Sequence, residues 1–535
     1  MVHLQHLPLL AWSVLAVLLL PQISNAQQNP PVIEWQKSFG GSGLDAANSI
    51  QQTSDGGYIV AGASFSSNGD VTENHGSSDS ADFWIVKLTN AGELEWQRPL
   101  GGSDYDGANS IQQTSDGGYI VAGGSGSEDG DVTGLHGGYD FWIVKLTSTG
   151  VIEWQRALGG WADDEANFIQ QTRDGGYIVA GESNSRDGDV RGNHGGYDYW
   201  IVKLTSTGVI QWQQSLGASR NDYAESIAQT SDGGYIVAGA SHSTDGSDDP
   251  NAWLVKLTEA GGIQWQKSLG GSEIDEATSI VQTGDGGYIV GGGSHSTDGD
   301  ASDNHGSSDY WIVKLTGTGE IEWQKSLGGS GYDFATSITP TRDGGYIVAG
   351  YSYSTDGDVT GNHEYADYWI VKLTSSGVIE WQQSLGGTEH DIANSIVQTS
   401  DRGCVVAGWS LSNNGDVTGH HGSSDSSDYW IVKLGPITSD VQPEPAESMA
   451  PLTIHPNPAH TTAMLKIQPP DEAEYTIELI SPLSQVVKRQ SAQLGLGEQS
   501  VHLTNLESLP AGSYEVIVSG GGKQVAHSRL VLLGE

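Results

Sequence analysis

The chain has 535 residues and carries 66 acidic against 23 basic side chains, for a formal net charge of −43. A field of that sign repels phosphate backbones and argues against a nucleic-acid partner. The 17 Trp and 20 Tyr provide much apolar area to bury, which argues against a disordered chain, and the 75 Gly are typical of short strands joined by tight turns.

The N-terminus has the features of a secretory signal peptide. An apolar run covers residues 7–20, and Ser24–Ala26 forms a small-x-small cleavage site. The alternative, an uncleaved membrane anchor, is disfavoured because the apolar run is short. We therefore expect residues 1–26 to be removed after Ala26, and the exported chain to have no transmembrane segment.

An octapeptide, DGGYIVAG, begins at Asp55 and returns six times, twice in altered form. Successive copies start 61, 58, 58, 53, 58 and 58 residues apart. Two further segments, of the types IEWQKS and DYWIVKL, also occur seven times each between the octapeptides. Self-similarity at a near-fixed period of this size indicates a repeat architecture.

Each period contains four short strand candidates, most of them rich in β-branched and aromatic residues. In the first period they cover residues 47–53, 57–64, 83–89 and 93–100. The second and third candidates are apolar at consecutive positions, so both faces of the sheet should be buried. This burial is expected when each sheet lies between two neighbours, as in a β-propeller.

The ends of the array predict a closed ring. The chain enters on the fourth strand of a period, residues 33–36, and leaves on a third strand, residues 430–434. In a ring, this offset lets the N-terminal strand complete the last blade and removes an exposed edge. We predict a seven-bladed β-propeller of about 58 residues per blade over residues 27–434, with a β-solenoid as the alternative. The repeats resemble those of bacterial extracellular β-propeller repeat proteins, which implies a secreted scaffold and specifies no reaction.

The repeat stops after Leu434. Residues 435–450 are rich in Pro and acidic residues and form a predicted linker. Residues 451–535 contain alternating segments typical of a small Ig-like β-sandwich, at 475–481, 499–506, 513–519 and 528–533.

This last segment resembles the C-terminal sorting domain of the type IX secretion system. The resemblance rests on a proline-asparagine-proline opening and a later L-x-A-G-x-Y motif, with Pro456, Asn457, Pro458, Gly512 and Tyr514 as the matching residues. It implies Sec export to the periplasm and then passage through the outer membrane. The secretion machinery would be the partner of residues 451–535, and the protein would be attached to the cell surface or released.

The long loops between second and third strands repeat an aspartate in six of the seven blades, at Asp70, Asp131, Asp189, Asp300, Asp358 and Asp416. A histidine follows each of them. Three interpretations are open: turn-capping loop architecture, a Ca²⁺ site built from carboxylates and carbonyls, or a transition-metal site that uses the histidines. No cofactor is certain, and Ca²⁺ is the metal that the residues favour.

The loops between blades repeat a second aspartate in all seven blades, from Asp45 to Asp391. We interpret it as a loop-holding residue, because catalysis needs one asymmetric constellation whereas these are near-copies. The chain has no G-x-S-x-G, Walker A or H-E-x-x-H motif. Trp161, Arg220 and Trp409 are single departures from the repeat that could mark a unique site.

Two functions follow from this pattern. The first is a noncatalytic, monomeric propeller on the cell surface or in the medium, which presents repeated sites to a glycan, a surface protein or an ion. The second is an extracellular polymer-degrading enzyme, a glycan hydrolase or lyase, with its pocket at the ring axis. An asymmetric polar site at the axis would favour the enzyme, and uniform seven-fold symmetry would count against it.

Overall fold

The computed structural model describes residues 28–76, 80–243, 249–423, 425–436, 452–469, 473–480, 486–495, 497, 499–509, 512–520 and 523–532. The predicted signal peptide with its cleavage site at Ala26, and nearly all of the predicted linker, lie outside these residues. The chain falls into two compact units that meet in sequence at Gly435 and Pro436. Within the described ranges, no helix is long and apolar enough to cross a membrane.

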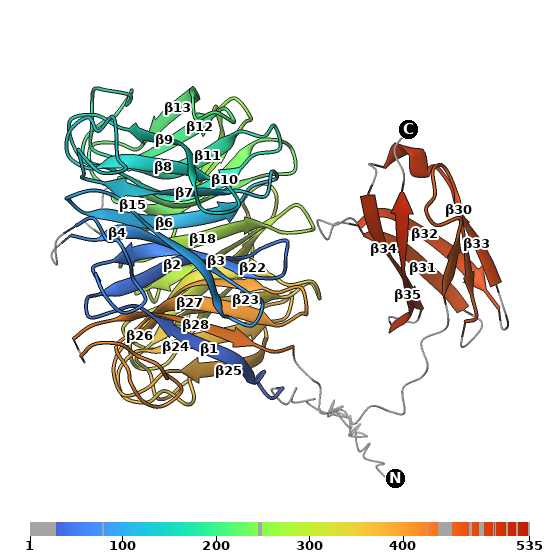
Figure 1. Cartoon of the computed structure of the whole chain (residues 1–535). Helices are drawn as coiled ribbons and strands as arrows, with labels where there is room; N and C mark the ends of the chain where they lie inside the picture. Colours follow the sequence, from blue (N-terminus) through green and yellow to red (C-terminus); the bar gives the residue numbers. More distant parts are fainter. Residues whose placement is uncertain are drawn as a thin grey trace, which may run out of the picture. The chain divides into compact units, whose positions relative to one another are not determined.

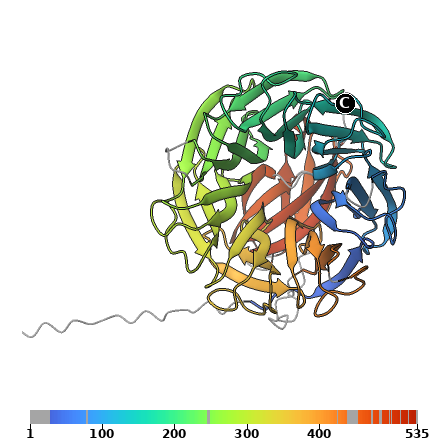
Figure 2. The same cartoon turned by 90° about the vertical axis from the view of Figure 1, so that its left-hand side faces the viewer.

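The first unit consists of seven antiparallel four-stranded sheets, arranged as the blades of a ring (Figures 1 and 2). Blades 1 to 3 contain β2 (Asp45–Gln52), β3 (Tyr58–Ser64), β4 (Asp82–Leu88) and β5 (Leu94–Leu100); β6 (Asp106–Gln113), β7 (Tyr119–Ser125), β8 (Asp140–Leu146) and β9 (Ile152–Leu158); and β10 (Asp164–Gln171), β11 (Tyr177–Ser183), β12 (Asp198–Leu204) and β13 (Ile210–Leu216). Blades 4 and 5 contain β14 (Asp222–Gln229), β15 (Tyr235–Ser241), β16 (Asn251–Leu257) and β17 (Ile263–Leu269); and β18 (Asp275–Gln282), β19 (Tyr288–Ser294), β20 (Asp309–Leu315) and β21 (Ile321–Leu327).

Blade 6 contains β22 (Asp333–Pro340), β23 (Tyr346–Ser352), β24 (Asp367–Leu373) and β25 (Ile379–Leu385). Blade 7 contains β26 (Asp391–Gln398), β27 (Cys404–Ser410) and β28 (Asp428–Leu434), and its outer strand is β1 (Ile33–Phe39), which pairs with β28. The first strand of each blade lies next to the first strand of the following blade around the axis, and β26 lies next to β2. The predicted seven-bladed β-propeller is therefore confirmed.

The octapeptide folds the same way in each blade because each of its residues has the same structural role. Asp55 accepts hydrogen bonds from the Thr53 hydroxyl and the Gly57 amide, and its carboxylate lies 3.0 Å from the buried Lys87 ammonium. Gly56 has a φ of 86°, a left-handed conformation that the tight turn requires. The following strand is buried at all seven positions, as is the adjacent third strand, so both faces of each sheet are covered.

The tryptophans connect the blades. The indole of Trp84 in a third strand is fully buried, and its Nε1 donates to Gln97 in the same blade. The indole of Trp35 in an outer strand packs edge-on against Tyr58 of the next blade, with ring centroids 5.5 Å apart. Such pairs recur at five further junctions (Trp96–Tyr119, Trp154–Tyr177, Trp212–Tyr235, Trp265–Tyr288 and Trp323–Tyr346). At the remaining junction Cys404 replaces the tyrosine and is buried.

The second unit has two sheets around one apolar core, as in the predicted Ig-like sandwich. One sheet has the order β29 (Thr453–His455), β30 (Ala463–Ile467) and β33 (Gln499–Leu503). The other has the order β32 (Val486–Leu494), β31 (Ala473–Ile480), β34 (Gly512–Gly520) and β35 (Lys523–Leu532), and a single 3₁₀ turn, η1, covers Leu506–Ser508. The predicted strands fall on β31, β33, β34 and β35, whereas β29, β30 and β32 are additional.

Candidate functional site

The six predicted metal residues lie in the long loops, where they contact the neighbouring loop backbone. The Asp70 amide donates to the Gly40 carbonyl over 2.8 Å, and the Gly40 amide donates back to the Asp70 carboxylate over 3.2 Å. The backbone contact recurs at Asp131, Asp189, Asp300, Asp358 and Asp416. Each aspartate therefore joins a long loop to the loop that links two blades.

The histidines of these loops are also engaged inside the protein. His75 directs its backbone amide and its Nδ1 at the carboxylate of Asp82, which is completely buried. The same pair recurs at His136, His194, His305, His363 and His421. No group of three or more His, Cys, Asp or Glu able to hold a metal ion occurs among the residues that the structure describes. Calcium binding by the six aspartates remains a prediction.

The interblade aspartates hold their loops, as interpreted from the sequence. Asp45 is fully buried and accepts hydrogen bonds from the Gly41 amide and from the hydroxyls of Ser64 and Ser66. An aspartate begins every inner strand, and an alanine follows two residues later in every blade. These positions form a constant framework around the axis.

Against this framework, a few positions near the start of the inner strands differ from blade to blade. The second residue of the inner strand is in turn Ala46, Gly107, Glu165, Tyr223, Glu276, Phe334 and Ile392. Its cross-strand partner is in turn Ala63, Gly124, Glu182, Ala240, Gly293, Tyr351 and Trp409. These side chains lie where the inner strands begin, on the face that carries the long loops. The axial surface is thus asymmetric although the ring is nearly symmetric.

We call the most distinctive part of this surface the axial patch, defined by Glu165, Glu182, Glu225, Glu276, Tyr332, Phe334, Tyr351 and Tyr353. It draws on blades 3 to 6, and its residues come from inner strands, second strands and the adjoining loops. One side of the patch is acidic and the other is aromatic.

Four glutamates form the acidic side. Glu165 and Glu182 are directly opposite each other on β10 and β11, an unfavourable arrangement for like charges. Glu225 is the extra residue of a β-bulge in β14. Its burial, together with the charges of Glu276 and Glu165, raises the pKa of Glu225 to about 7. Burial and the charges of Glu225 and Glu165 likewise raise the pKa of Glu182 well above its ordinary value.

Few donors compensate these carboxylates. Asn109 donates to Glu165 over 3.0 Å, and Asn167 donates to Glu182 over 2.7 Å. Among the described residues, no hydrogen-bond donor contributes to the pKa of Glu225. In other blades the position of Glu225 is Asn or Thr, and Asn48 there donates to the Ala108 carbonyl of the next blade. A local rule of the fold is therefore broken at Glu225, which is typical of a functional position.

Aromatic rings form the other side. Tyr332 is stacked on Phe334 and on Tyr351, with centroids 6.0 Å apart in both pairs and interplanar angles of 15° and 18°. Tyr353, which is 40% exposed, lies edge-on to Tyr351 at 6.2 Å. The Phe334 ring packs against Gly293, whose cross-strand partner is Glu276, so the two sides of the patch are adjacent.

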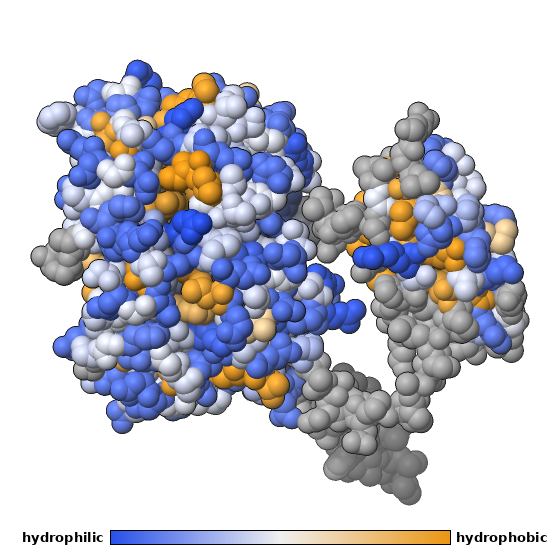
Figure 3. Space-filling view, in the orientation of Figure 1, coloured by the Kyte–Doolittle hydropathy of each residue, from blue (hydrophilic) through white to orange (hydrophobic). Residues whose placement is uncertain are grey.

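Further rings extend this aromatic side into blades 5 and 7. His295 is edge-on to Tyr332 at 5.6 Å, and His390 lies 5.7 Å from Tyr353 and 5.0 Å from Tyr365. By contrast, the flank of the propeller seen in Figure 3 is mostly hydrophilic, with small separate hydrophobic patches. Single exposed apolar residues of that kind need no functional explanation.

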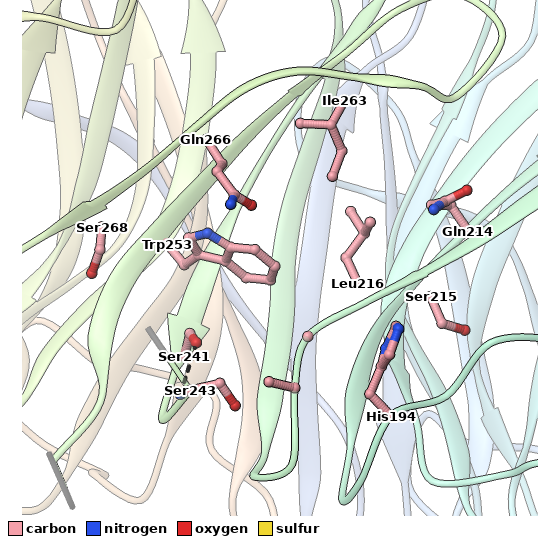
Figure 4. A pocket seen from close by; sticks show the side chains of 12 residues that line it. His194, Gln214, Ser215, Leu216, Ser241, Ser243, Trp253, Ile263, Gln266 and Ser268 are labelled. Atoms are coloured by element: carbon pink, nitrogen blue, oxygen red, sulfur yellow. Dashed lines mark hydrogen bonds between the residues drawn. The ribbon is translucent and has the colours of Figure 1, made fainter. Parts of the chain in front are cut away.

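A cavity of about 560 Å³ lies beside Trp253 in blade 4 (Figure 4). Its lining includes His194, Ser215, Ser243 and Gln266. Blade 4 has the shortest link between its second and third strands, so the long-loop residue that packs near Trp84, Val71, has no counterpart there. Because Ser243 directly precedes residues 244–248, which lie outside the described structure, we assign no ligand to this cavity.

The sorting motif lies at one end of the second unit. The Asn457 side chain accepts a hydrogen bond from the Val531 amide and donates one to the Arg529 carbonyl, so it fixes the opening segment to the last strand, β35. Gly512 begins β34, and Tyr514 is buried in the core of the sandwich. Asn457 and Gly512 therefore lie beside the end of β35, and Tyr514 contributes to the core.

The fold and these motifs define a repeat propeller protein with an appended sorting domain. Residues 453–532 match the family model of the secretion system C-terminal sorting domain. The predicted type IX sorting domain is thereby confirmed, and it marks the chain for secretion to the cell surface or beyond.

Other similarities cover parts of proteins or are distant. Regulatory protein FlaEY of Caulobacter vibrioides (strain ATCC 19089 / CIP 103742 / CB 15) is 31% identical over 136 residues, which covers 22% of this chain and 14% of that protein. PorZ, an essential surface component of the type IX secretion system of Porphyromonas gingivalis, has a TM-score of 0.40 at 11% identity and covers 92% of this chain and 60% of PorZ. Puromycin hydrolase has a TM-score of 0.44 at 11% identity, covering 83% and 62%. These TM-scores are too low to carry an argument about activity.

The sequence interpretation concentrated on residues that every blade repeats and missed the axial patch. Of the three single departures, Trp161 is 77% exposed in an interblade loop, and Trp409 lies opposite Ile392 at a variable axial position. Comparison of equivalent positions in the seven blades could have identified the axial patch. The variable columns include the second residue of the inner strand and its cross-strand partner.

Proposed function

We propose that this protein is a noncatalytic binding protein that the type IX secretion system exports, and that the axial patch is its binding surface. The observation that carries the proposal is the contrast between a constant framework and variable axial positions. A scaffold role would require only the framework. Recognition of one ligand requires a particular set of side chains at one place.

The composition of the patch supports binding. Partly exposed aromatic rings offer contact area at low entropic cost, and the carboxylates offer hydrogen-bond acceptors and charge. Burial of Glu182 and Glu225 close to other carboxylates lowers stability, and a ligand that compensates them would recover part of that loss. The predicted ligand classes, a glycan or a surface protein, both remain compatible with this chemistry.

A variant with a more symmetric axial surface tests the proposal. Blade 1 has Ala46 and Ala63 where blades 3 and 6 have their charged and aromatic pairs, so the framework tolerates alanine at these positions. We expect Glu165→Ala, Glu182→Ala, Phe334→Ala and Tyr351→Ala together to leave the thermal melt cooperative and to abolish binding on an array of glycans and peptides.

The matched control changes the outer flank instead of the axis. Val151→Ser and Val209→Ser replace two side chains that are each 55% exposed. This control should retain all array binding. Binding that survives in the symmetric variant would place the ligand elsewhere and overturn the proposal.

A second candidate function is hydrolysis of an extracellular polymer. Two observations favour it. The axial surface is asymmetric, as expected for an enzyme. Burial, together with the charges of Glu276 and Glu165, also raises the pKa of Glu225 to about 7, a value suited to a general acid. An enzyme would release new sugar ends from a polysaccharide, and Glu225→Gln would abolish that release without weakening polymer binding. A binding protein would release none, and Glu225→Gln would change affinity alone.

A further inference from the structure

We propose that the axial patch binds a basic side chain of a polypeptide partner, with the ammonium or guanidinium group seated between the glutamates and the aromatic rings. This inference rests on the proposed function, because it names the ligand of the same surface. It assigns the chemistry that would recognise the partner: positive charge on a long, slender stem.

Charge complementarity is the first reason. The groups that act on Glu225 through their charge are Glu276 and Glu165, and both are negative. Burial raises the pKa of Glu276, and the charges of His295 and His242 oppose that rise. A cation placed among these carboxylates would pair with their ionised form and reduce their mutual repulsion, whereas an anionic ligand would increase it.

The aromatic side supplies the second reason. The faces of tyrosine and phenylalanine rings attract cations within about 6 Å of the ring centroid. Tyr332 stacks on both Phe334 and Tyr351, and Phe334 packs against Gly293, the cross-strand partner of Glu276. Adjacent rings and carboxylates make a site for a basic group with an aliphatic stem, because the stem packs on the rings while its charged end pairs with the glutamates.

The depth of Glu225 supplies the third reason. It lies two residues beyond Tyr223 along β14, which corresponds to about 7 Å at the rise of a β-strand. A lysine or arginine side chain spans that depth with a slender stem. A neutral sugar carries no positive charge to pair with these carboxylates, so the acidic side favours a basic peptide over an oligosaccharide.

The test uses the full chain and two fluorescent peptides that differ in one group. Each peptide has a Gly-Ser background with two lysines, and the lysines are acetylated in the second peptide, which removes their charge. We expect fluorescence anisotropy to detect binding of the first peptide only, weaker at high salt. Replacing all four glutamates by glutamine (Glu165→Gln, Glu182→Gln, Glu225→Gln, Glu276→Gln) should weaken binding at least about tenfold.

Because the whole protein is acidic, a charge-matched control is essential. Glu73→Gln, Glu128→Gln, Glu259→Gln and Glu507→Gln together remove the same charge from exposed positions outside the patch, and we expect at most about a twofold loss. A second variant, Tyr332→Leu with Tyr353→Leu, keeps apolar volume but removes the ring faces, and should weaken binding about fivefold.

Equal losses in the patch variant and the charge-matched control would reveal nonspecific attraction and overturn the inference. Binding of both peptides alike, or of neither, would also overturn it. Array binding of a neutral oligosaccharide that the symmetric variant abolishes would overturn this inference but leave the proposed function intact. Loss of neither ligand in the symmetric variant would overturn the proposed function itself.

Discussion

The propeller should become more stable as the pH falls from 8 to 5, because burial raises the pKa of several of its aspartates. At each blade junction two acidic or amide side chains flank one glycine. Beside Gly101, for example, lie the carboxylates of Asp82 and Asp106, both fully buried. Burial is the largest cause of the raised pKa of Asp106, and the charge of Asp82 adds to it.

The size of the effect follows from four aspartates whose pKa is raised from 3.8 to about 6: Asp106, Asp140, Asp367 and Asp391. A raised folded-state pKa means that the folded protein binds the proton more readily than the unfolded chain. The resulting stability is complete below the unfolded pKa and is lost as the pH rises through 6. At pH 5 each group contributes about 1.4 kcal/mol relative to pH 8, and the four together contribute roughly 5.5 kcal/mol.

Urea unfolding followed by tryptophan fluorescence measures this change in the propeller alone, because no tryptophan occurs after Trp430. Blade 4 provides the matched substitution, since Asn251 stands there in place of the aspartate of the other blades. Asp140→Asn and Asp367→Asn together should remove about half of the pH dependence. As a control, Asp174→Asn should leave the dependence unchanged, because the pKa of Asp174 is about 2 and it does not titrate between pH 5 and 8. A stability that stays constant or falls from pH 8 to 5 would refute the reasoning.

Three further predictions concern other parts of the molecule. Deleting residues 451–535 should leave a folded propeller in the periplasm, as fractionation would report; normal surface display would contradict the sorting role. If the six long-loop aspartates, such as Asp189, bind Ca²⁺, a Ca²⁺ concentration 100 times the dissociation constant should stabilise the propeller by about 2.7 kcal/mol. A thermal melt measures this gain, and Asp189→Ala should reduce it. A melting midpoint that is the same in EDTA and in Ca²⁺ would leave the aspartates as loop-holding residues. Gly239→Ala should destabilise the protein by about 3 kcal/mol in urea unfolding, because its Cβ would lie 1.9 Å from the Tyr223 carbonyl oxygen; Gly284→Ala, with no atom within 4 Å of its Cβ, should be neutral.

The propeller was predictable from the sequence because each blade solves the same packing problem with the same residues. Gly56 must adopt a left-handed conformation, Lys87 needs the Asp55 carboxylate, and Trp84 fills the space between sheets in every copy. Repetition therefore made each structural role visible several times. The sandwich was harder to predict, because β29 has only three residues and β32 contains charged residues that hide its alternation.

The candidate site could not be read in the same way, because repetition marks what the fold needs and not what a ligand needs. The repeated aspartates and histidines looked functional as a set, yet Asp70 and His75 are engaged by backbone and by Asp82 within the protein. A unique ligand requires positions that escape the repeat, such as Glu225 among the asparagines and threonines of the other blades. In a tandem repeat the blades themselves serve as an alignment, and departures from it that lie close together in the fold indicate a functional site.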